Sequence, residues 1–162
     1  MRLKNRTLLA LFVVFALIPP LSSADVYTHG EGGIQIDVPR SWHVDEGDEV
    51  LSLETPDGSV LILFWVPEGD TWEQALDGLG AELDQIMSDI SVENDGEEGD
   101  LNGMSFFEIV GTGSVEGIAV EWSLTLLLAK NPVIALAFAE SDGWEANQDA
   151  VFKLIGGIKK MR

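Results

Sequence analysis

Cysteine is absent from the 162-residue sequence. The chain therefore has no disulfide bond, no thiolate nucleophile, no cysteine-ligated zinc or iron–sulfur centre, and no cysteine to carry a lipoprotein's lipid. Positive charge is also scarce, because 9 Lys and Arg stand against 28 Asp and Glu, which gives a formal net charge of -19. This balance excludes the basic surface that binding to nucleic acid or to anionic lipid requires.

Long hydrophobic runs are also lacking, and the longest one lies near the start of the chain. It extends from Leu8 to Ile18, about 11 residues, which is shorter than the roughly 20 residues that a helix needs to cross a bilayer. Three basic residues precede it, namely Arg2, Lys4 and Arg6. A basic start followed by a short apolar run is typical of a secretory signal peptide.

A cleavage site for this signal peptide is predicted after Ala24, because Ser22 and Ala24 place small residues at positions -3 and -1. Residues 1–24 are then the signal peptide, and residues 25–162 form one exported domain. That domain has six basic and 28 acidic side chains, a net charge of -22. We expect a periplasmic or secreted protein that does not insert into a membrane once the signal peptide is removed.

Periodicity of the apolar residues predicts strands followed by a helix, then strands followed by a second helix. The predicted strands are 34–38, 50–54, 59–66, 102–110, 117–129 and 133–140, and the predicted helices are 72–90 and 145–161. Strands 50–54 and 59–66 form a hairpin through Pro56, Asp57 and Gly58. Residues 93–100 are expected to be a polar connection, and Gly111 to Gly113 a turn between two long strands.

Short turns between consecutive strands imply antiparallel pairing. We therefore predict an α+β fold in which two main helices pack on a largely antiparallel sheet. Strand 59–66 is apolar on both faces, which favours a central position with cover on each side. The small residues Ala135, Ala137 and Ala139 alternate along strand 133–140, where they allow a helix to approach the sheet closely.

The segment from Gly33 to Trp42 reads GIQIDVPRSW and resembles the N-terminal hairpin of the PsbP-like (PsbP/Mog) superfamily. The Pro56-Asp57-Gly58 turn, an Asn102-Gly103 turn before a long strand and the closing amphipathic helix extend the resemblance over almost the whole exported domain. It implies an antiparallel sheet between helices in a sandwich. It also implies a non-enzymatic binding or assembly factor, with no catalytic residue that carries over.

Two histidines are candidates for metal ligands. His29 and His43 are each followed two residues later by an acid, Glu31 and Asp45. Residues i and i+2 of a strand share a face, so a site of two histidines and a carboxylate can form if the two segments pair. The alternative is that both are surface histidines of a very acidic chain.

Two acidic segments are candidates for calcium binding, since calcium prefers oxygen ligands. The first contains Glu93, Asp95, Glu97, Glu98 and Asp100, and the second is residues 45–49. The first fails the EF-hand spacing, because counting from Gly96 puts Asn102 where that loop needs a glutamate. Solvated acidic turns are the alternative, and we expect no other cofactor.

Other patterns of catalytic residues do not match. The glycines of residues 111–117 have the wrong spacing for a nucleotide loop and precede no helix, and neither Ser105 nor Ser114 lies in a Gly-x-Ser-x-Gly frame. Most of the five tryptophans are expected in the core, whereas Trp144, just ahead of the last predicted helix, is expected to be a hydrophobic staple or an exposed contact.

These observations favour an exported binding or assembly factor that acts through an acidic surface. Its acidity favours a cationic protein partner or a metal ion. The alternative is a hydrolase or metal-dependent protein that uses a histidine and carboxylates, which would require His29 or His43 to meet two carboxylates in a deep pocket. A third reading is that the charge serves solubility alone.

Overall fold

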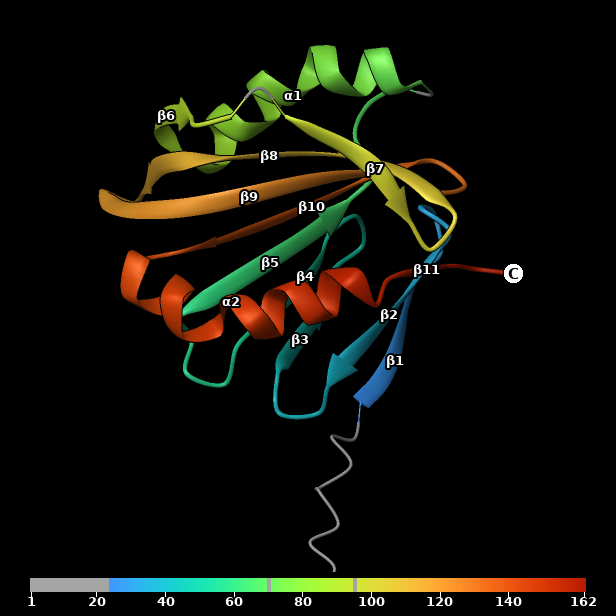
Figure 1. The fold of residues 1–162 in the computed structure, drawn as a ribbon, viewed down its shortest axis with the longest axis horizontal. Coiled ribbons are helices and arrows are strands. Elements are labelled where there is room, and N and C mark those ends of the chain that lie inside the picture. Colours follow the sequence, from blue (N-terminus) through green and yellow to red (C-terminus); the bar gives the residue numbers. More distant parts are fainter. Residues whose placement is uncertain (1–23, 70, 95) are drawn as a thin grey trace, which may run out of the picture.

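The computed structural model describes residues 24–69, 71–94 and 96–162, so the predicted signal peptide lies outside the described residues except for Ala24. The described part forms a sandwich of two sheets and two helices (Figure 1). In chain order its elements are β1 (Ala24–His29), β2 (Ile34–Pro39), β3 (His43–Glu46), β4 (Leu51–Glu54), β5 (Val60–Trp65), α1 (Trp72–Ile86), β6 (Ser88–Val92), β7 (Glu97–Leu101), β8 (Met104–Val115), β9 (Ile118–Leu128), β10 (Pro132–Ala139), α2 (Ser141–Gly156) and β11 (Lys159–Lys160).

The larger sheet has the strand order β3-β4-β5-β10-β9-β8-β6, and β7 also pairs with β8. Every pair in it is antiparallel, as are the pairs of the smaller sheet, β1-β2-β11. The predicted α+β class with a largely antiparallel sheet is therefore confirmed. Strand β5 lies between β4 and β10, the central position that its apolar faces predicted.

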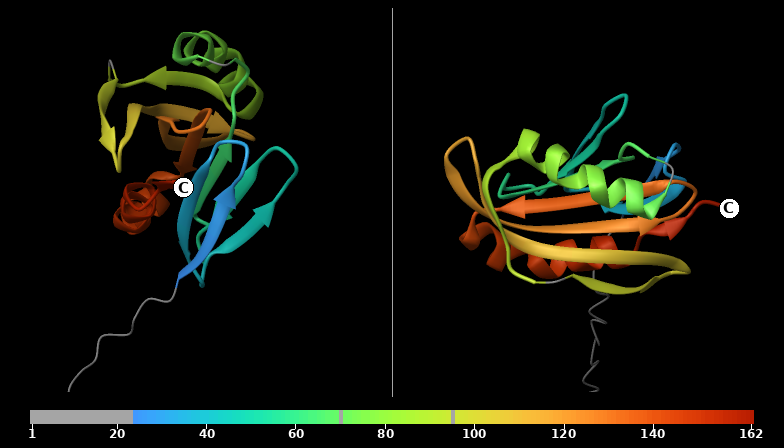
Figure 2. Two further views of the ribbon diagram at one scale, coloured as in Figure 1. Left: turned by 90° about the vertical axis from the view of Figure 1, so that its right-hand side faces the viewer. Right: turned by 90° about the horizontal axis from the view of Figure 1, so that it is seen from above.

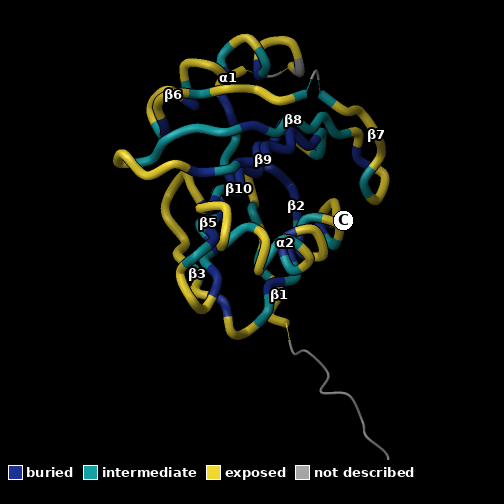
Figure 3. Tube along the Cα trace, turned by 60° about the vertical axis from the view of Figure 1, so that its left-hand side comes forward, coloured by how far each residue is buried: buried dark blue, intermediate teal, exposed yellow. Residues whose placement is uncertain are grey.

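Two hydrophobic cores lie on opposite faces of the larger sheet. On one face, α2 and the smaller sheet pack against β4, β5 and β10, with Ile34, Ile36 and Leu154 fully or almost fully buried. The alternating alanines of β10 belong to this core and lie against α2, as their small size predicted. The opposite core is smaller, and α1 closes it with Ala75, Leu79, Leu83 and Met87. Figure 3 shows the buried positions gathered in the central strands.

The first helix is shorter than its apolar spacing predicted. It begins at the cap Thr71, whose Oγ1 accepts a hydrogen bond from the Gln74 amide at 3.3 Å, and it ends at Ile86 instead of residue 90. Residues 88–92 form strand β6 because the edge of β8 offers backbone partners there. Ile90, expected on the helix face, is therefore a strand residue.

The polar connection 93–100 is also partly a strand, since β7 pairs with β8 from Glu97 to Leu101. Between β6 and β7, the Glu93 amide donates to the Val110 carbonyl at 2.9 Å and Asn94 Oδ1 accepts from the Val110 amide at 3.1 Å. The two short strands and this side chain thus follow one another along the same edge of β8.

The turn expected at Gly111 to Gly113 lies instead at Glu116 and Gly117, where both residues have positive φ. Gly111 is inside β8, opposite Trp122 of β9. A Cβ at this position would overlap the Ser91 carbonyl and the Trp122 ring. The glycine therefore serves close packing beneath β6 and not a change of chain direction.

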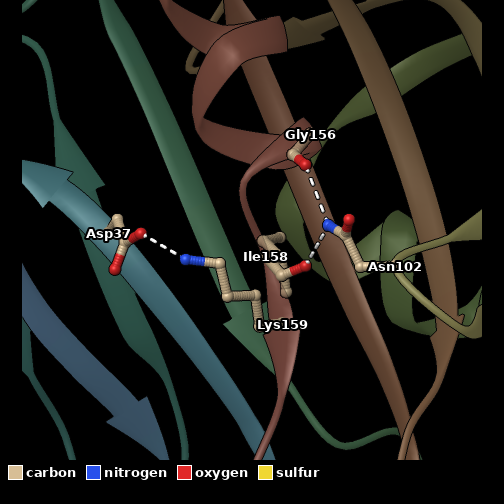
Figure 4. Close-up of polar contacts among 5 residues, drawn as sticks. All are labelled: Asp37, Asn102, Gly156, Ile158 and Lys159. Atoms are coloured by element: carbon tan, nitrogen blue, oxygen red, sulfur yellow. Dashed lines mark hydrogen bonds and ion pairs between the residues drawn. The ribbon is translucent and has the colours of Figure 1, made fainter.

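The second helix starts and ends earlier than the predicted range 145–161. It spans Ser141–Gly156, and Ile158, which is fully buried, follows it in the core. The Asn102 side chain, from the β7–β8 turn, donates through Nδ2 to the carbonyls of Gly156 at 3.0 Å and Ile158 at 2.7 Å (Figure 4). These bonds and the pairing of β11 with β2 hold the tail outside the helix.

Candidate functional site

A groove of about 530 Å³ lies between the second half of α1 and the end of β5. Leu63, Trp65 and Val66 supply apolar surface, and Val50, 40% exposed, continues it at the rim. The wall formed by α1 contains the small residues Gly78 and Ala81. The groove thus has an apolar floor on the sheet and one wall formed by small side chains of α1.

Carboxylates surround this apolar floor. Glu49 and Glu68 line it and are exposed, while Glu82 of α1 is half-buried. Glu82 Oε2 accepts a hydrogen bond from Trp65 Nε1 at 2.7 Å, and its Oε1 accepts from the Glu68 amide at 3.4 Å. These bonds orient the indole and join α1 to the strand below it. Glu49, Glu68 and Glu82 make the groove negatively charged, and α1 contains no Lys or Arg.

Sequence reasoning missed this groove, although it recognised the acidic surface in general terms. The residues that form it come from the β3–β4 turn, β5, the connection after β5 and α1, and none of them belongs to a recognisable motif. The only local feature of the sequence that pointed to the groove was that both faces of strand 59–66 are apolar. In the structure, α1 leaves one of these faces partly uncovered.

The two candidate histidines do not come together in the way a shared metal site requires. His29 ends β1 in the smaller sheet, and its Nδ1 accepts a hydrogen bond from the Gly32 amide at 3.1 Å. His43 begins β3 in the larger sheet, opposite Glu54. Since β1 pairs with β2 and β3 with β4, the pairing on which the site depended does not occur.

His29 and Glu31 instead face the acidic turn between β3 and β4. A small pocket of about 130 Å³ is lined by His29 and Glu31 from one side and by Glu46, Asp48 and Glu49 from the other. Within the ranges that the structure describes, no three His, Asp or Glu side chains converge closely enough to hold a metal ion. The acidic turn therefore adds negative charge beside the groove, which Glu49 also lines.

The other acidic segment is spread along the edge of the sheet. Glu93 is exposed in the connection after β6, Glu97 and Glu98 lie on β7, and the Asp100 carboxylate accepts a hydrogen bond from the Gly103 amide at 2.9 Å. Asp95, the remaining predicted ligand, lies outside the described residues. Among those described, an extended strand separates the carboxylates instead of wrapping them around one point.

His43 also lines an open pocket of about 480 Å³ with Trp42, Glu54 and Asp57. Asp57 is part of the β4–β5 turn, where its Oδ1 accepts hydrogen bonds from Thr55 Oγ1 at 2.7 Å and Ser59 Oγ at 2.8 Å. These bonds hold the pKa of the Asp57 carboxyl far below its usual range. Asn147 of α2 donates to Ser59 Oγ at 2.9 Å, so the turn is tied to the helix.

This polar cluster stabilises the hairpin and its contact with α2. Asp57 Oδ1 accepts the hydrogen bonds of Thr55 and Ser59 and so stabilises the turn. No hydrogen bond between His43 and a carboxylate occurs among the described residues. The pocket thus places two carboxylates, Glu54 and Asp57, beside His43.

The tryptophans fulfil the core expectation in part. Trp122 is buried and donates through Nε1 to the Thr112 carbonyl at 2.9 Å, and Trp42 is also buried. Trp144 is half-buried in the first turn of α2, edge-on to Phe152 at a ring separation of 6.3 Å. Trp65 contributes to the groove, a role that its position in a strand did not reveal.

The fold is that of the PsbP-like proteins, as solved structures show. Cyanobacterial PsbP (CyanoP) from Synechocystis sp. PCC 6803 is similar, with a TM-score of 0.60 and 12% identity over 86% of this chain and 94% of that one. LpqN, which is involved in cell envelope biogenesis of Mycobacterium tuberculosis, has a TM-score of 0.59 and 16% identity over 85% and 90%. PA94 of Pseudomonas aeruginosa, of unknown function, has a TM-score of 0.53 and 9% identity over 82% and 94%.

No family model matches the sequence, and no curated protein matches it either. The resemblance to PsbP-like proteins noted in the sequence is thus confirmed at the level of the fold. Neither helix in the described ranges has the length and apolarity to traverse a bilayer.

Proposed function

We propose that this protein is an exported, non-enzymatic binding factor whose groove between α1 and β5 holds a cationic, partly apolar segment of a partner protein. The observation that carries the proposal is the combination, in one groove, of the apolar surface of Leu63 and Trp65 with the carboxylates of Glu49, Glu68 and Glu82. A segment that carries Lys or Arg beside an apolar side chain complements both features.

The overall charge supports a cationic partner. With a net charge of -22, residues 25–162 attract positive chains and repel negative ones, which raises association rates at low ionic strength. The part played by LpqN in cell envelope biogenesis favours an accessory role in the envelope for this chain as well. The predicted signal peptide agrees with that location.

Two glycines of α1 provide a matched pair of variants for a test. Gly78 lines the groove, whereas Gly80 is exposed and has no atom within 4 Å of a Cβ added to it. A Cβ at Gly78 meets only Glu82 Oε1, at 3.8 Å. Gly78→Leu should therefore fill the groove, and Gly80→Leu should change the helix in a similar way while leaving the groove open.

The probe is a 15-residue peptide of leucine and lysine, and its control replaces every lysine by glutamate. Binding is measured by calorimetry at about 50 mM and 500 mM NaCl. We expect the lysine peptide alone to bind, its affinity to fall at least tenfold in high salt, and Gly78→Leu to weaken it at least tenfold while Gly80→Leu does not. Equal binding of both peptides, no binding, or equal losses in the two variants would overturn the proposal.

A further inference from the structure

The face of the larger sheet that carries α1 has only this one helix among the described residues. α1 packs on the middle of the sheet, where it contacts Leu124 and Leu126 of β9 and Ile134 and Leu136 of β10. Figure 2 shows α1 above these strands, with the β3–β4 hairpin lying to one side of it. The end of β5 contacts α1 through Trp65, and the rest of β5 and β4 lie beyond the helix.

Strand register shows which side chains this uncovered portion presents. Leu63 lies opposite Leu136 on β10 and Ser52 on β4, and Leu61 lies opposite Phe138 and Glu54. Because residues opposite each other share a face, Leu61, Leu63 and Trp65 form an apolar line along β5 on the face that α1 occupies. All three are half-buried, and Glu54 and Ser52 flank the line on β4.

The dimensions of this uncovered strip match a second helix. Adjacent strands are about 4.8 Å apart, so the boundary of β5 and β4 is about 9.6 Å from the boundary of β9 and β10 beneath α1. Packed helices lie about 8–10 Å apart. The small residues Gly78 and Ala81 are on the wall of α1 that faces this position, where they allow a neighbouring helix to come close.

We infer that the partner segment is a basic amphipathic helix that packs beside α1 over β5 and β4. This inference rests on the proposed function and specifies the conformation of its ligand. Alternate residues of a strand are about 6.6 Å apart, and helix residues four apart are separated by about 6 Å. Apolar residues at i, i+4 and i+8 of the partner therefore meet Leu61, Leu63 and Trp65 in turn.

Charge fixes which sides of that helix are basic. Glu49 and Glu68 lie at the groove end of the strip, and Glu54 and Asp45 lie along β4 and β3 on the same face, since Asp45 is opposite Ser52. The side of the partner helix away from α1 therefore carries Lys or Arg. This is the helix-in-groove mode of recognition, with a sheet as the floor.

Two 15-residue peptides of identical composition test the inference. One places leucine at i, i+4 and i+8 among lysines and alanines, and the other rearranges them so that leucine alternates with the other residues. Calorimetry gives the affinities, and circular dichroism at 222 nm reports helix formation on binding. We expect the first peptide to bind at least tenfold more tightly than the second and to become helical when bound.

Two charge-reversed variants locate the footprint. Glu54→Lys, on the far side of the strip, should weaken the helical peptide about fivefold or more, and Glu97→Lys, on the distant strand β7, should change it less than twofold. If the rearranged peptide binds equally well, or if Glu54→Lys and Glu97→Lys behave alike, the helix inference is wrong. Retained sensitivity to Gly78→Leu would then show that the groove proposal stands, whereas loss of all peptide binding would refute both.

Discussion

Asn102 connects the β7–β8 turn to the end of α2, and its removal should loosen the C-terminal tail. The substitution Asn102→Gly deletes both hydrogen bonds to the Gly156 and Ile158 carbonyls. The substitution adds no backbone strain, because Asn102 has a φ of 52° and glycine adopts positive φ readily. The result therefore measures the side-chain bonds and not backbone strain.

Each of these bonds contributes about 0.5–1.5 kcal/mol net, and the lower half of that range applies because Asn102 is exposed. We expect Asn102→Gly to lower the free energy of unfolding by about 1–2 kcal/mol, which corresponds to a fall in Tm of about 3–8 °C for a domain of this size. Chemical denaturation followed by tryptophan fluorescence measures the first quantity, and calorimetry the second.

Glu116→Gly is the matched control. Glu116 also has a φ of 52° in a hairpin turn and is exposed, and its side chain makes no hydrogen bond to the described residues. This variant should keep or slightly raise the stability. If Asn102→Gly were no less stable than Glu116→Gly, the two hydrogen bonds would contribute nothing and the account of the tail would be wrong.

Three further predictions concern the core, the sheet edge and the hairpin turn. Leu136→Ala, at a fully buried position, should cost about 2–5 kcal/mol in urea denaturation, and a loss below 1 kcal/mol would contradict the described core. Gly111→Ala should destabilise the protein because its Cβ overlaps the Ser91 carbonyl, while Gly80→Ala should stabilise it by about 1 kcal/mol; equal effects would argue against the packing under β6. Folding lowers the pKa of Asp57, so the ionised carboxylate contributes its full stabilisation above the usual carboxyl pKa of about 4, and this contribution is lost as the pH falls below that value. The Tm difference between the wild type and Asp57→Asn should therefore shrink in acid. A difference that does not change with pH would refute this.

The sequence was informative wherever a structural signal is local. The hairpin through Pro56-Asp57-Gly58, the central strand β5 and the alternating alanines of β10 follow from residue spacing and turn chemistry alone. These features depend on neighbours a few residues apart, so a pattern in the chain reports them directly.

Features that depend on distant segments were not predictable in the same way. Ile90 continues the helical spacing of α1, but the free edge of β8 draws residues 88–92 into a strand. Gly111 was expected to mark a turn. It is required instead because the Trp122 ring leaves no room for a side chain at this position, and Trp122 lies on the next strand, so the local sequence does not show the contact. The groove arises because one helix covers only part of a wide sheet, and a strand pattern does not show how much of its face a helix will leave open.

Strand β8 is longer than either strand that lines its outer edge, and this has a consequence for aggregation. A bare edge of twelve residues would be a template on which another unfolded chain could add a strand. Here β6, the Glu93 amide, the Asn94 side chain and the acidic β7 cover that edge one after another, and β7 also repels an incoming acidic copy. Loss of the Asn94 side chain would free only the Val110 amide, because the Glu93 amide still bonds the Val110 carbonyl, so an incoming strand would meet one exposed donor there and not an open edge.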